Sequence, residues 1–183
     1  MNDRETTAQP TSKSIDSTGS WILDPDLSSV TFAHKTLWGM ATVNGTFGQV
    51  AGKGEGTGSD GTASGTLVIQ AASVDTNHRR RDGHLRSSMF LDAEKFPALT
   101  FEADGVETDT DATARIAGRL TVKDHMIDLA FTANTVVADP DTLRVTATVD
   151  VDRTEFGITT NQLGMIKGLA TVSVDLLFRR GLD

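Results

Sequence analysis

The sequence predicts an all-β fold in which an antiparallel sheet curls on itself. From Trp21 onward, apolar and polar side chains alternate along successive short runs, and turn-forming residues separate those runs. In addition, only one segment, around residues 78–95, departs from this pattern and has a helical character. Strands with one apolar and one polar face are typical of antiparallel sheets, whereas parallel βαβ sheets have strands that are apolar on both faces.

The expected strands follow one another along the chain. In "SSVTFAHK", Val30 and Phe32 share one face, and in "GTLVIQAASV" Leu67 and Ile69 do the same. The next runs are "ALTFEA", "RIAGRLTVK", "MIDLAFTANTV", "LRVTATVDVD" and "ATVSVDLLF", in which apolar residues recur at every second position. Turns are expected at Asn44-Gly45, Ser59-Asp60-Gly61, Lys123-Asp124 and Asp139-Pro140-Asp141.

About eight such strands fit either an up-and-down barrel or a sandwich, since both bury one face and limit exposed edges. Alanines are frequent among the branched residues of the apolar face. Small residues of this kind leave room for a ligand in a barrel of about eight strands. The residues alone nevertheless favour a filled core over a cavity.

The segment around residues 78–95 is the one helical interruption. The run Asp-Thr-Asn at 75–77 offers N-cap side chains, and Leu85 and Met89 lie four apart, so they share a helical face. Gly83 weakens this helix, and Pro97 ends it before the strand "ALTFEA".

The chain of 183 residues is long enough for one domain. Residues 1–19 are rich in Ser, Thr and Asp and poor in large apolar residues, so we expect a disordered N-terminal tail. Residues 20–183 are expected to form the folded domain. No apolar run has the length of a membrane span and no secretory signal is visible, so a cytoplasmic location is the default expectation.

Composition argues against several functions. The net charge of -8 disfavours a nucleic-acid partner, which requires a basic face. The absence of cysteine rules out disulfides, thiol catalysis and Cys-ligated metals. The glycine-rich run "GQVAGKGEGTGSDGTASG" does not match a phosphate-binding loop, because Lys53 is followed by Gly54, and it is interpreted as a flexible hairpin tip.

The charged cluster in "VDTNHRRRDGHLRSS" is the main candidate for chemistry. His78, Asp82 and His84 do not share one helical face, so we expect no metal site there; a hydrogen bond between Asp82 and His84 that fastens the helix is favoured. Ser87 and Ser88 lie near His84 without a nucleophile-elbow motif, which disfavours a hydrolase triad. The arginines of the segment are interpreted as a solvated face or an anion-binding group.

Five motifs, in order, resemble those of the YceI-like family of lipocalin-like, polyisoprenoid-binding proteins. They are "WILDPDLSSVTFAHKTL", "VNGTF", "SVDTNHRRRDGHLRSSMFLDAEKFPALTF", "GRLTVKDHMIDL" and "RTEFGI", and together they extend over about residues 21–178. The resemblance implies an antiparallel eight-stranded lipocalin-like β-barrel, with a short helical segment covering or flanking it and a ligand-sized cavity inside.

The resemblance also implies a non-catalytic protein that binds, carries or sequesters an isoprenoid lipid or quinone, with no cofactor and no metal. Combined with the alternation, it predicts that the ligand is lined by Phe32, Val43, Phe47, Leu67, Ile69, Leu85, Met89, Phe90, Phe101, Leu120, Leu129, Phe131, Val145, Val149 and Phe156. Candidate contacts to a polar headgroup are Arg81, His84, Arg86 and Arg153.

Two alternatives share the same fold. One is an enzyme that acts on a lipid or small amphiphile with His84 as acid or base. The other is a general binder of amphiphilic compounds in a stress response. The expected partner is an apolar small molecule or lipid, and a homodimer is compatible with the sequence.

Overall fold

A computed structural model describes residues 18–36, 40–56, 62–110, 112–159 and 166–181. It contains a short helix α1 (Arg79–Arg86) and short 3-10 turns η1 (Pro25–Leu27), η3 (Ala71–Ser73) and η4 (Arg153–Phe156). The strands are β1 (Gly19–Leu23), β2 (Ser29–Thr36), β3 (Ala41–Phe47), β4 (Val50–Gly56), β5 (Thr62–Gln70), β6 (Val74–Asp75), β7 (Ala98–Thr110), β8 (Thr113–Val122), β9 (His125–Asp139), β10 (Thr142–Asp152) and β11 (Ile166–Arg180).

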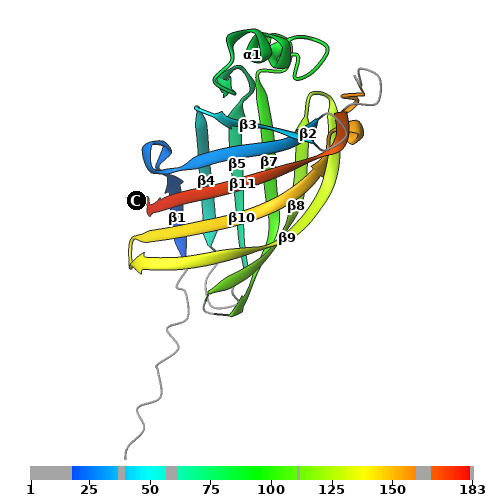
Figure 1. Cartoon of the computed structure of the whole chain (residues 1–183). Coiled ribbons are helices and arrows are strands. Elements are labelled where there is room, and N and C mark those ends of the chain that lie inside the picture. The colour runs from blue at the N-terminus through cyan, green and yellow to red at the C-terminus, as the bar shows by residue number, and fades with distance from the viewer. Residues whose placement is uncertain (1–17, 37–39, 57–61, 111, 160–165, 182–183) are drawn as a thin grey trace, which may run out of the picture.

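Eight of these strands form a closed antiparallel barrel, in the order β1-β4-β5-β7-β8-β9-β10-β11. The ring closes where β11 pairs with β1, with Trp21 opposite Arg180 and Leu23 opposite Phe178. Figure 1 shows this closure, with the end of β11 beside β1. The predicted eight-stranded lipocalin-like barrel is therefore confirmed, and the sandwich that the residues alone left open is not formed.

The strands β2, β3 and β6 extend the barrel wall toward α1. β11 is long enough to pair with β1 through its last residues and with β2 over Ala170–Asp175. β2 then pairs with β3, and β3 pairs with the two-residue β6 that leads into α1. In Figure 1 this part of the wall lies beneath the helix, which covers one end of the barrel.

The period-two pattern is confirmed in the strands. In β10, Ala147 is buried and packs with Ile116 and Ala133 inside the barrel, whereas Arg144 projects outward. Arg144 makes a bidentate ion pair with Asp175 of the neighbouring β11, with both N–O distances at 2.6 Å. The alternation thus separates an apolar interior from a polar exterior.

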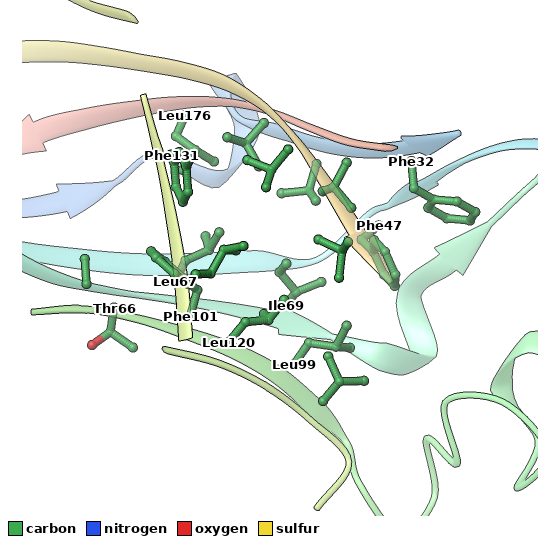
Figure 2. Close-up of a pocket in the computed structure, with 18 of the residues that line it drawn as sticks. Phe32, Phe47, Thr66, Leu67, Ile69, Leu99, Phe101, Leu120, Phe131 and Leu176 are labelled. Atoms are coloured by element: carbon green, nitrogen blue, oxygen red, sulfur yellow. The ribbon is translucent and has the colours of Figure 1, made fainter. Parts of the chain in front are cut away.

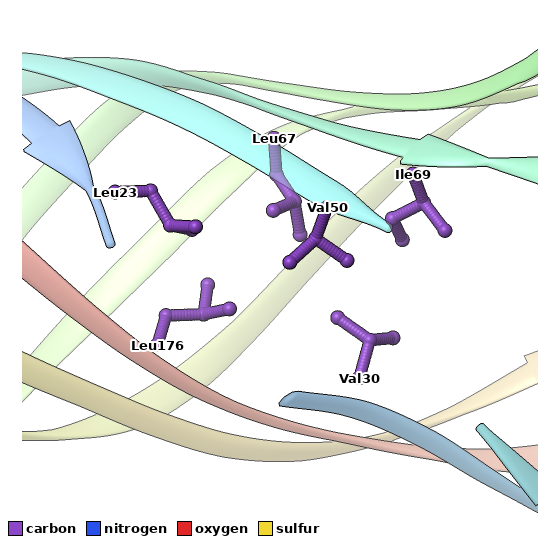
Figure 3. Close-up of a cluster of buried hydrophobic side chains, with 6 residues drawn as sticks. All are labelled: Leu23, Val30, Val50, Leu67, Ile69 and Leu176. Atoms are coloured by element: carbon purple, nitrogen blue, oxygen red, sulfur yellow. The ribbon is translucent and has the colours of Figure 1, made fainter. Parts of the chain in front are cut away.

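The core lies against the inner wall. One cluster of buried residues joins β1, β2, β4, β5 and β11, and Figure 3 shows its side chains converging from opposite walls: Leu23, Val30, Val50, Leu67, Ile69 and Leu176. A further cluster joins Val122 of β8 to Phe156 and Ile158 beside η4, and Phe90 and Leu91 from the segment after α1 pack on it. This contact seats the helical segment on the barrel.

The helical segment is shorter than the 78–95 range predicted. α1 spans Arg79–Arg86, and the chain then continues through turns whose hydrogen bonds include Phe90 N–H to Ser87 O at 3.0 Å. The N-cap is His78, whose Nδ1 accepts the Arg81 N–H at 3.3 Å, so the expectation of a cap within residues 75–77 is wrong. Asp75 Oδ1 instead accepts the backbone N–H of Asn77 at 2.7 Å, and Thr76 bonds Asp82 and Arg81, as described below.

The predicted turn at Asn44-Gly45 is also wrong, because both residues lie within β3. Gly45 is opposite Phe32 of β2, and a Cβ at Gly45 would overlap the Phe32 ring and approach Thr76 Cγ2 at 2.8 Å. The glycine is therefore required for side-chain packing and not for a turn. The turns at Lys123-Asp124 and Asp139-Pro140-Asp141 are confirmed, and Ser59-Asp60-Gly61 lies outside the described residues.

The predicted disordered tail, residues 1–19, lies almost wholly outside the described residues as well. Its last residue, Gly19, begins β1 and pairs with Gly56 of β4. Within the described residues, every helix falls short of the length and apolar character that a membrane-spanning helix requires.

Candidate ligand-binding cavity

The barrel encloses a cavity of about 520 Å³. Most of its wall consists of inward-facing apolar side chains, and Figure 2 shows such residues from several strands around the space, among them Leu67, Phe101 and Phe131. The Phe101 and Phe131 rings lie 5.6 Å apart in a tilted arrangement. Volumes of several hundred Å³ with mostly apolar walls are typical of sites for small molecules.

The structure brings most of the predicted lining residues together at this cavity. The wall includes Phe32, Val43, Phe47, Leu67, Ile69, Leu85, Phe90, Phe101, Leu120, Leu129, Phe131, Val145, Val149 and Phe156. These residues come from strands and from the segment around α1, which are far apart in the chain. The filled core that the residues alone favour is not formed.

Met89 does not lie in the wall. Its side chain is 51% exposed, and it is absent from the cavity lining. The prediction placed Met89 one helical turn after Leu85, but α1 ends at Arg86. The chain changes direction there, so Met89 faces away while Leu85 and Phe90 face the cavity.

Glycine residues in β4 and β5 provide space within the barrel. Gly54 of β4 is opposite Gly65 of β5, Gly56 is opposite Ala63, and all four residues line the cavity. The run was interpreted as a flexible hairpin tip; its centre lies outside the described residues, and its flanks belong to β4 and β5. These strands pair with each other, and the absence of a side chain at Gly54 leaves volume in the cavity. A Cβ at Gly65 would lie 2.9 Å from Lys53 O, so this glycine allows the close approach of the two strands.

The covering segment is fastened by a network that we call the helix clasp, formed by Thr76, Arg81, Asp82 and Arg86. Asp82 Oδ1 accepts the backbone N–H of Thr76 at 2.8 Å and its hydroxyl at 2.5 Å. Arg81 donates from Nε to Thr76 Oγ1 at 2.7 Å and from Nη2 to Thr76 O at 2.8 Å. Both Thr76 and Asp82 are buried, and their polar atoms are thereby paired.

The helix clasp also explains the ionisation of Asp82. The hydroxyl of Thr76 lowers the pKa of the Asp82 carboxyl below its ordinary value, and the Thr76 N–H and the charge of Arg86 act in the same direction. Burial opposes this shift without cancelling it. The carboxylate is therefore held in its charged form as a structural acceptor.

Arg86 donates hydrogen bonds to backbone carbonyl oxygens of the preceding segment. Its Nε donates to Ala72 O at 2.8 Å and its Nη2 donates to Val74 O at 2.6 Å. Arg86 does not line the cavity, so its placement disagrees with the predicted headgroup contact. Arg81, His84 and Arg153 do line the cavity.

His84 does not form the predicted hydrogen bond with Asp82. Its ring packs edge-on against Phe90 with centroids 4.8 Å apart. Asp82, which was expected to bond His84, is bonded to Thr76 instead. Among the described residues, no group of three or more His, Asp or Glu side chains is arranged to hold a metal ion.

The inward face of β2 brings polar side chains to the cavity beside the aromatic Phe32. His34 and Thr36 line the wall there, together with Arg153 of η4. Burial lowers the pKa of His34, and the positive charge of Arg153 adds to that effect. Burial also lowers the pKa of the Arg153 guanidinium, while Asp152 opposes this shift.

Residues 21–178 match the YceI-like domain. The chain belongs to the YceI-like family. Sequence relatives named UPF0312 protein include one from Ectopseudomonas mendocina, 40% identical over 85 residues, and one from Azotobacter vinelandii, 44% identical over 54 residues. The aligned segments cover 46% and 30% of this chain and only 44% and 28% of those relatives.

Solved structures share the fold of this YceI-like chain at low sequence identity. Burkholderia cenocepacia BcnA has a TM-score of 0.77 at 16% identity, covering 85% of this chain and 98% of BcnA. A polyisoprenoid binding domain from Saccharophagus degradans has a TM-score of 0.75 at 14% identity, covering 88% and 98%. The Campylobacter jejuni YceI protein has a TM-score of 0.69 at 18% identity, covering 78% and 88%.

Sequence reasoning missed several cavity residues of this YceI-like barrel. His34 lies two and four positions after Phe32 and Val30, so the alternation already indicated that it shares their face. Trp21 of β1 also lines the cavity; it is the first large apolar residue of the folded part, so no earlier apolar repeat in the sequence indicated its direction. The cavity role of the β4 glycines had no signal in the sequence, because it depends on which strand lies opposite.

Proposed function

We propose that the protein binds an apolar isoprenoid-type lipid, such as a polyprenyl chain or an isoprenoid quinone, in the barrel interior and carries or sequesters it without chemical change. The observation that supports this proposal is the 520 Å³ cavity with its mainly apolar wall. The Saccharophagus degradans domain with the same fold is described as polyisoprenoid binding, which agrees with the proposal.

The driving force follows from the apolar wall. Each CH₂ group removed from water contributes about 0.8 kcal/mol, so about ten methylenes contribute roughly 8 kcal/mol before the ligand's ordering is subtracted. A flexible unsaturated chain adapts to the shape of the interior through its rotatable bonds, and it has few polar groups to desolvate. The length and shape of the cavity then determine which chains fit.

The surroundings of His84 favour binding over catalysis. A general acid or base needs a partner that orients it, and here the ring of His84 packs on Phe90 while the nearby carboxylate of Asp82 is committed to Thr76. The arginines of the helix clasp likewise bond to backbone and hydroxyl groups of the fold. Their polar atoms stabilise the covering segment.

The test is mass spectrometry of an organic extract from natively purified protein, followed by binding of added polyprenols and quinones. The proposal predicts recovery of an isoprenoid, or binding of the added compounds at micromolar concentration or below. Recovery of unrelated amphiphiles, with no affinity for isoprenoids, would favour the general binder, and failure to bind any apolar compound would refute the proposal.

A pair of substitutions in β10 distinguishes ligand binding inside the barrel from binding on its outer face. Val149 lines the cavity, whereas its neighbour Thr148 is exposed. V149R is expected to abolish binding because it places a charge in the apolar interior, and T148R is expected to leave binding unchanged. Circular dichroism of both variants checks that they are folded. Equal affinities in two folded variants would mean that the ligand binds elsewhere.

A further inference from the structure

His34 presents an unusual acceptor to the cavity. It lies on the inward face of β2, opposite Val43 of β3 and Ala170 of β11, and its side chain lines the cavity. Its Nδ1 is 3.0 Å from the carbonyl oxygen of Leu169. A carbonyl oxygen only accepts hydrogen bonds, so this contact assigns the proton of the ring to Nδ1.

The other ring nitrogen is therefore a lone-pair acceptor as long as the imidazole is neutral. Burial lowers the pKa of His34, and the positive charge of Arg153 lowers it further, which outweighs the opposing effect of the Leu169 carbonyl. The neutral ring is thus the form at pH 7, since its pKa lies below the ordinary value of 6.5. Nε2 is ready to accept a hydrogen bond.

Nε2 is buried and accepts no hydrogen bond from any of the described residues. A buried acceptor without a donor is unfavourable, and an isoprenoid chain has no donor to supply. A ligand whose polar end carries an O–H group supplies the missing donor once the side chains that cover Nε2 move aside.

We infer that His34 Nε2 accepts a hydrogen bond from a hydroxyl group of the ligand, so that the protein selects isoprenoids that end in an alcohol or a phenol. This inference rests on the proposed function and specifies the headgroup that the site recognises. Arg153 lines the same cavity and carries only donors, which suits the oxygen of that hydroxyl. Ketone, ether and hydrocarbon ends have no hydrogen for Nε2.

A matched pair of ligands tests the inference: geranylgeraniol and its methyl ether, which differ only in the terminal hydrogen donor. We expect the wild-type protein to bind the alcohol on the order of tenfold more tightly in a competition assay with a fluorescent apolar probe. H34L should reduce the affinity for the alcohol to that for the ether. V43A, which changes an apolar neighbour of His34 in the wall, should lower the affinity for both ligands equally and keep the preference for the alcohol.

The outcomes separate this inference from the proposed function. If neither compound binds the wild-type protein, the proposed function fails. If both bind equally well, the proposed function stands and the His34 inference is wrong. A reduced and an oxidised menaquinone with the same tail distinguish the two sources of the hydroxyl: preference for the reduced form indicates that a phenol is accepted, and preference for geranylgeraniol alone restricts the ligand to alcohols.

Two further measurements keep the test decisive if H34L does not fold. H34N retains a donor for the Leu169 carbonyl and removes the acceptor at the position of Nε2, so it should lose the preference while remaining folded. Nitrogen-15 NMR of the wild-type imidazole should show an unprotonated Nε2 whose resonance moves on addition of the alcohol and not of the ether. A proton on Nε2 in the unliganded protein would overturn the assignment.

Discussion

The hydroxyl of Thr76 donates a 2.5 Å hydrogen bond to Oδ1 of Asp82, six residues later in the chain. The same hydroxyl accepts from Arg81 Nε at 2.7 Å, so one buried oxygen links the start of the covering segment to α1. This relationship explains why the most polar stretch of the sequence lies over an apolar cavity. Its charges are used to hold the segment in place, and its apolar residues Leu85 and Phe90 face the interior.

Removing the negative charge of Asp82 should therefore destabilise the fold. D82N leaves the Thr76 hydroxyl without its charged partner, and we expect Tm to fall by roughly 5 °C, because hydrogen bonds to charged groups are stronger than neutral ones. Differential scanning calorimetry measures the change. E94Q, at an exposed position on the same segment, is the matched control and should leave Tm unchanged. An unaltered Tm in D82N would show that the charge of Asp82 contributes nothing to stability.

The contribution of Asp82 should also depend on pH. The pKa of Asp82 is below its ordinary value of 3.8, so its charged form is stabilised by folding. Its contribution is present above pH 3.8 and is lost as the pH falls through the pKa of the folded state. Urea unfolding of wild type and D82N from pH 7 to pH 2.5 should show a difference that shrinks only at the acidic end. A difference that grows on acidification would contradict this assignment.

Substitution of Gly45 and of Gly83 by alanine should change the free energy of unfolding in opposite directions. A Cβ at Gly45 would overlap the Phe32 ring and lie 2.8 Å from Thr76 Cγ2, so G45A should cost about 1–3 kcal/mol of unfolding free energy. A Cβ at Gly83, inside α1, would meet nothing within 4 Å, so G83A should stabilise the protein by about 0.5–1 kcal/mol. Urea titrations of both variants check the two signs. Similar effects in the two variants would contradict the packing at Gly45.

Trp21 should report ligand entry through its fluorescence. Its side chain lines the cavity, is only 5% exposed, and lies under the Arg180 guanidinium at 4.7 Å from the ring centroid. The second tryptophan, Trp38, lies outside the described residues, so W38F leaves Trp21 as the single emitter. We expect the emission of W38F to change on titration with an isoprenoid and to saturate. If calorimetry shows binding while the fluorescence emission stays unchanged, the ligand lies away from Trp21.

Much of the cavity wall could be predicted from periodicity together with family resemblance. Val145 and Val149 of β10 were assigned to the interior because every second residue of a strand faces the same side, and they line the cavity. The same reasoning failed at Met89, because helical spacing no longer applies once α1 ends at Arg86. The turn signal at Asn44-Gly45 was misleading for a different reason, because the dipeptide lies within β3, where the absence of a side chain at Gly45 leaves space for the Phe32 ring.

The class of fold, the family and the inward or outward direction of most strand residues could be predicted without coordinates, because they depend on local alternation and on ordered motifs. The tertiary structure decided which strands pair, how β11 closes the barrel on β1, and that Asp82 bonds Thr76 and not His84. It also decided which ring nitrogen of His34 carries the proton, because the partner of Nδ1, the Leu169 carbonyl, lies 135 residues away in the chain. Contacts of that separation are set by strand register, which a local pattern does not encode.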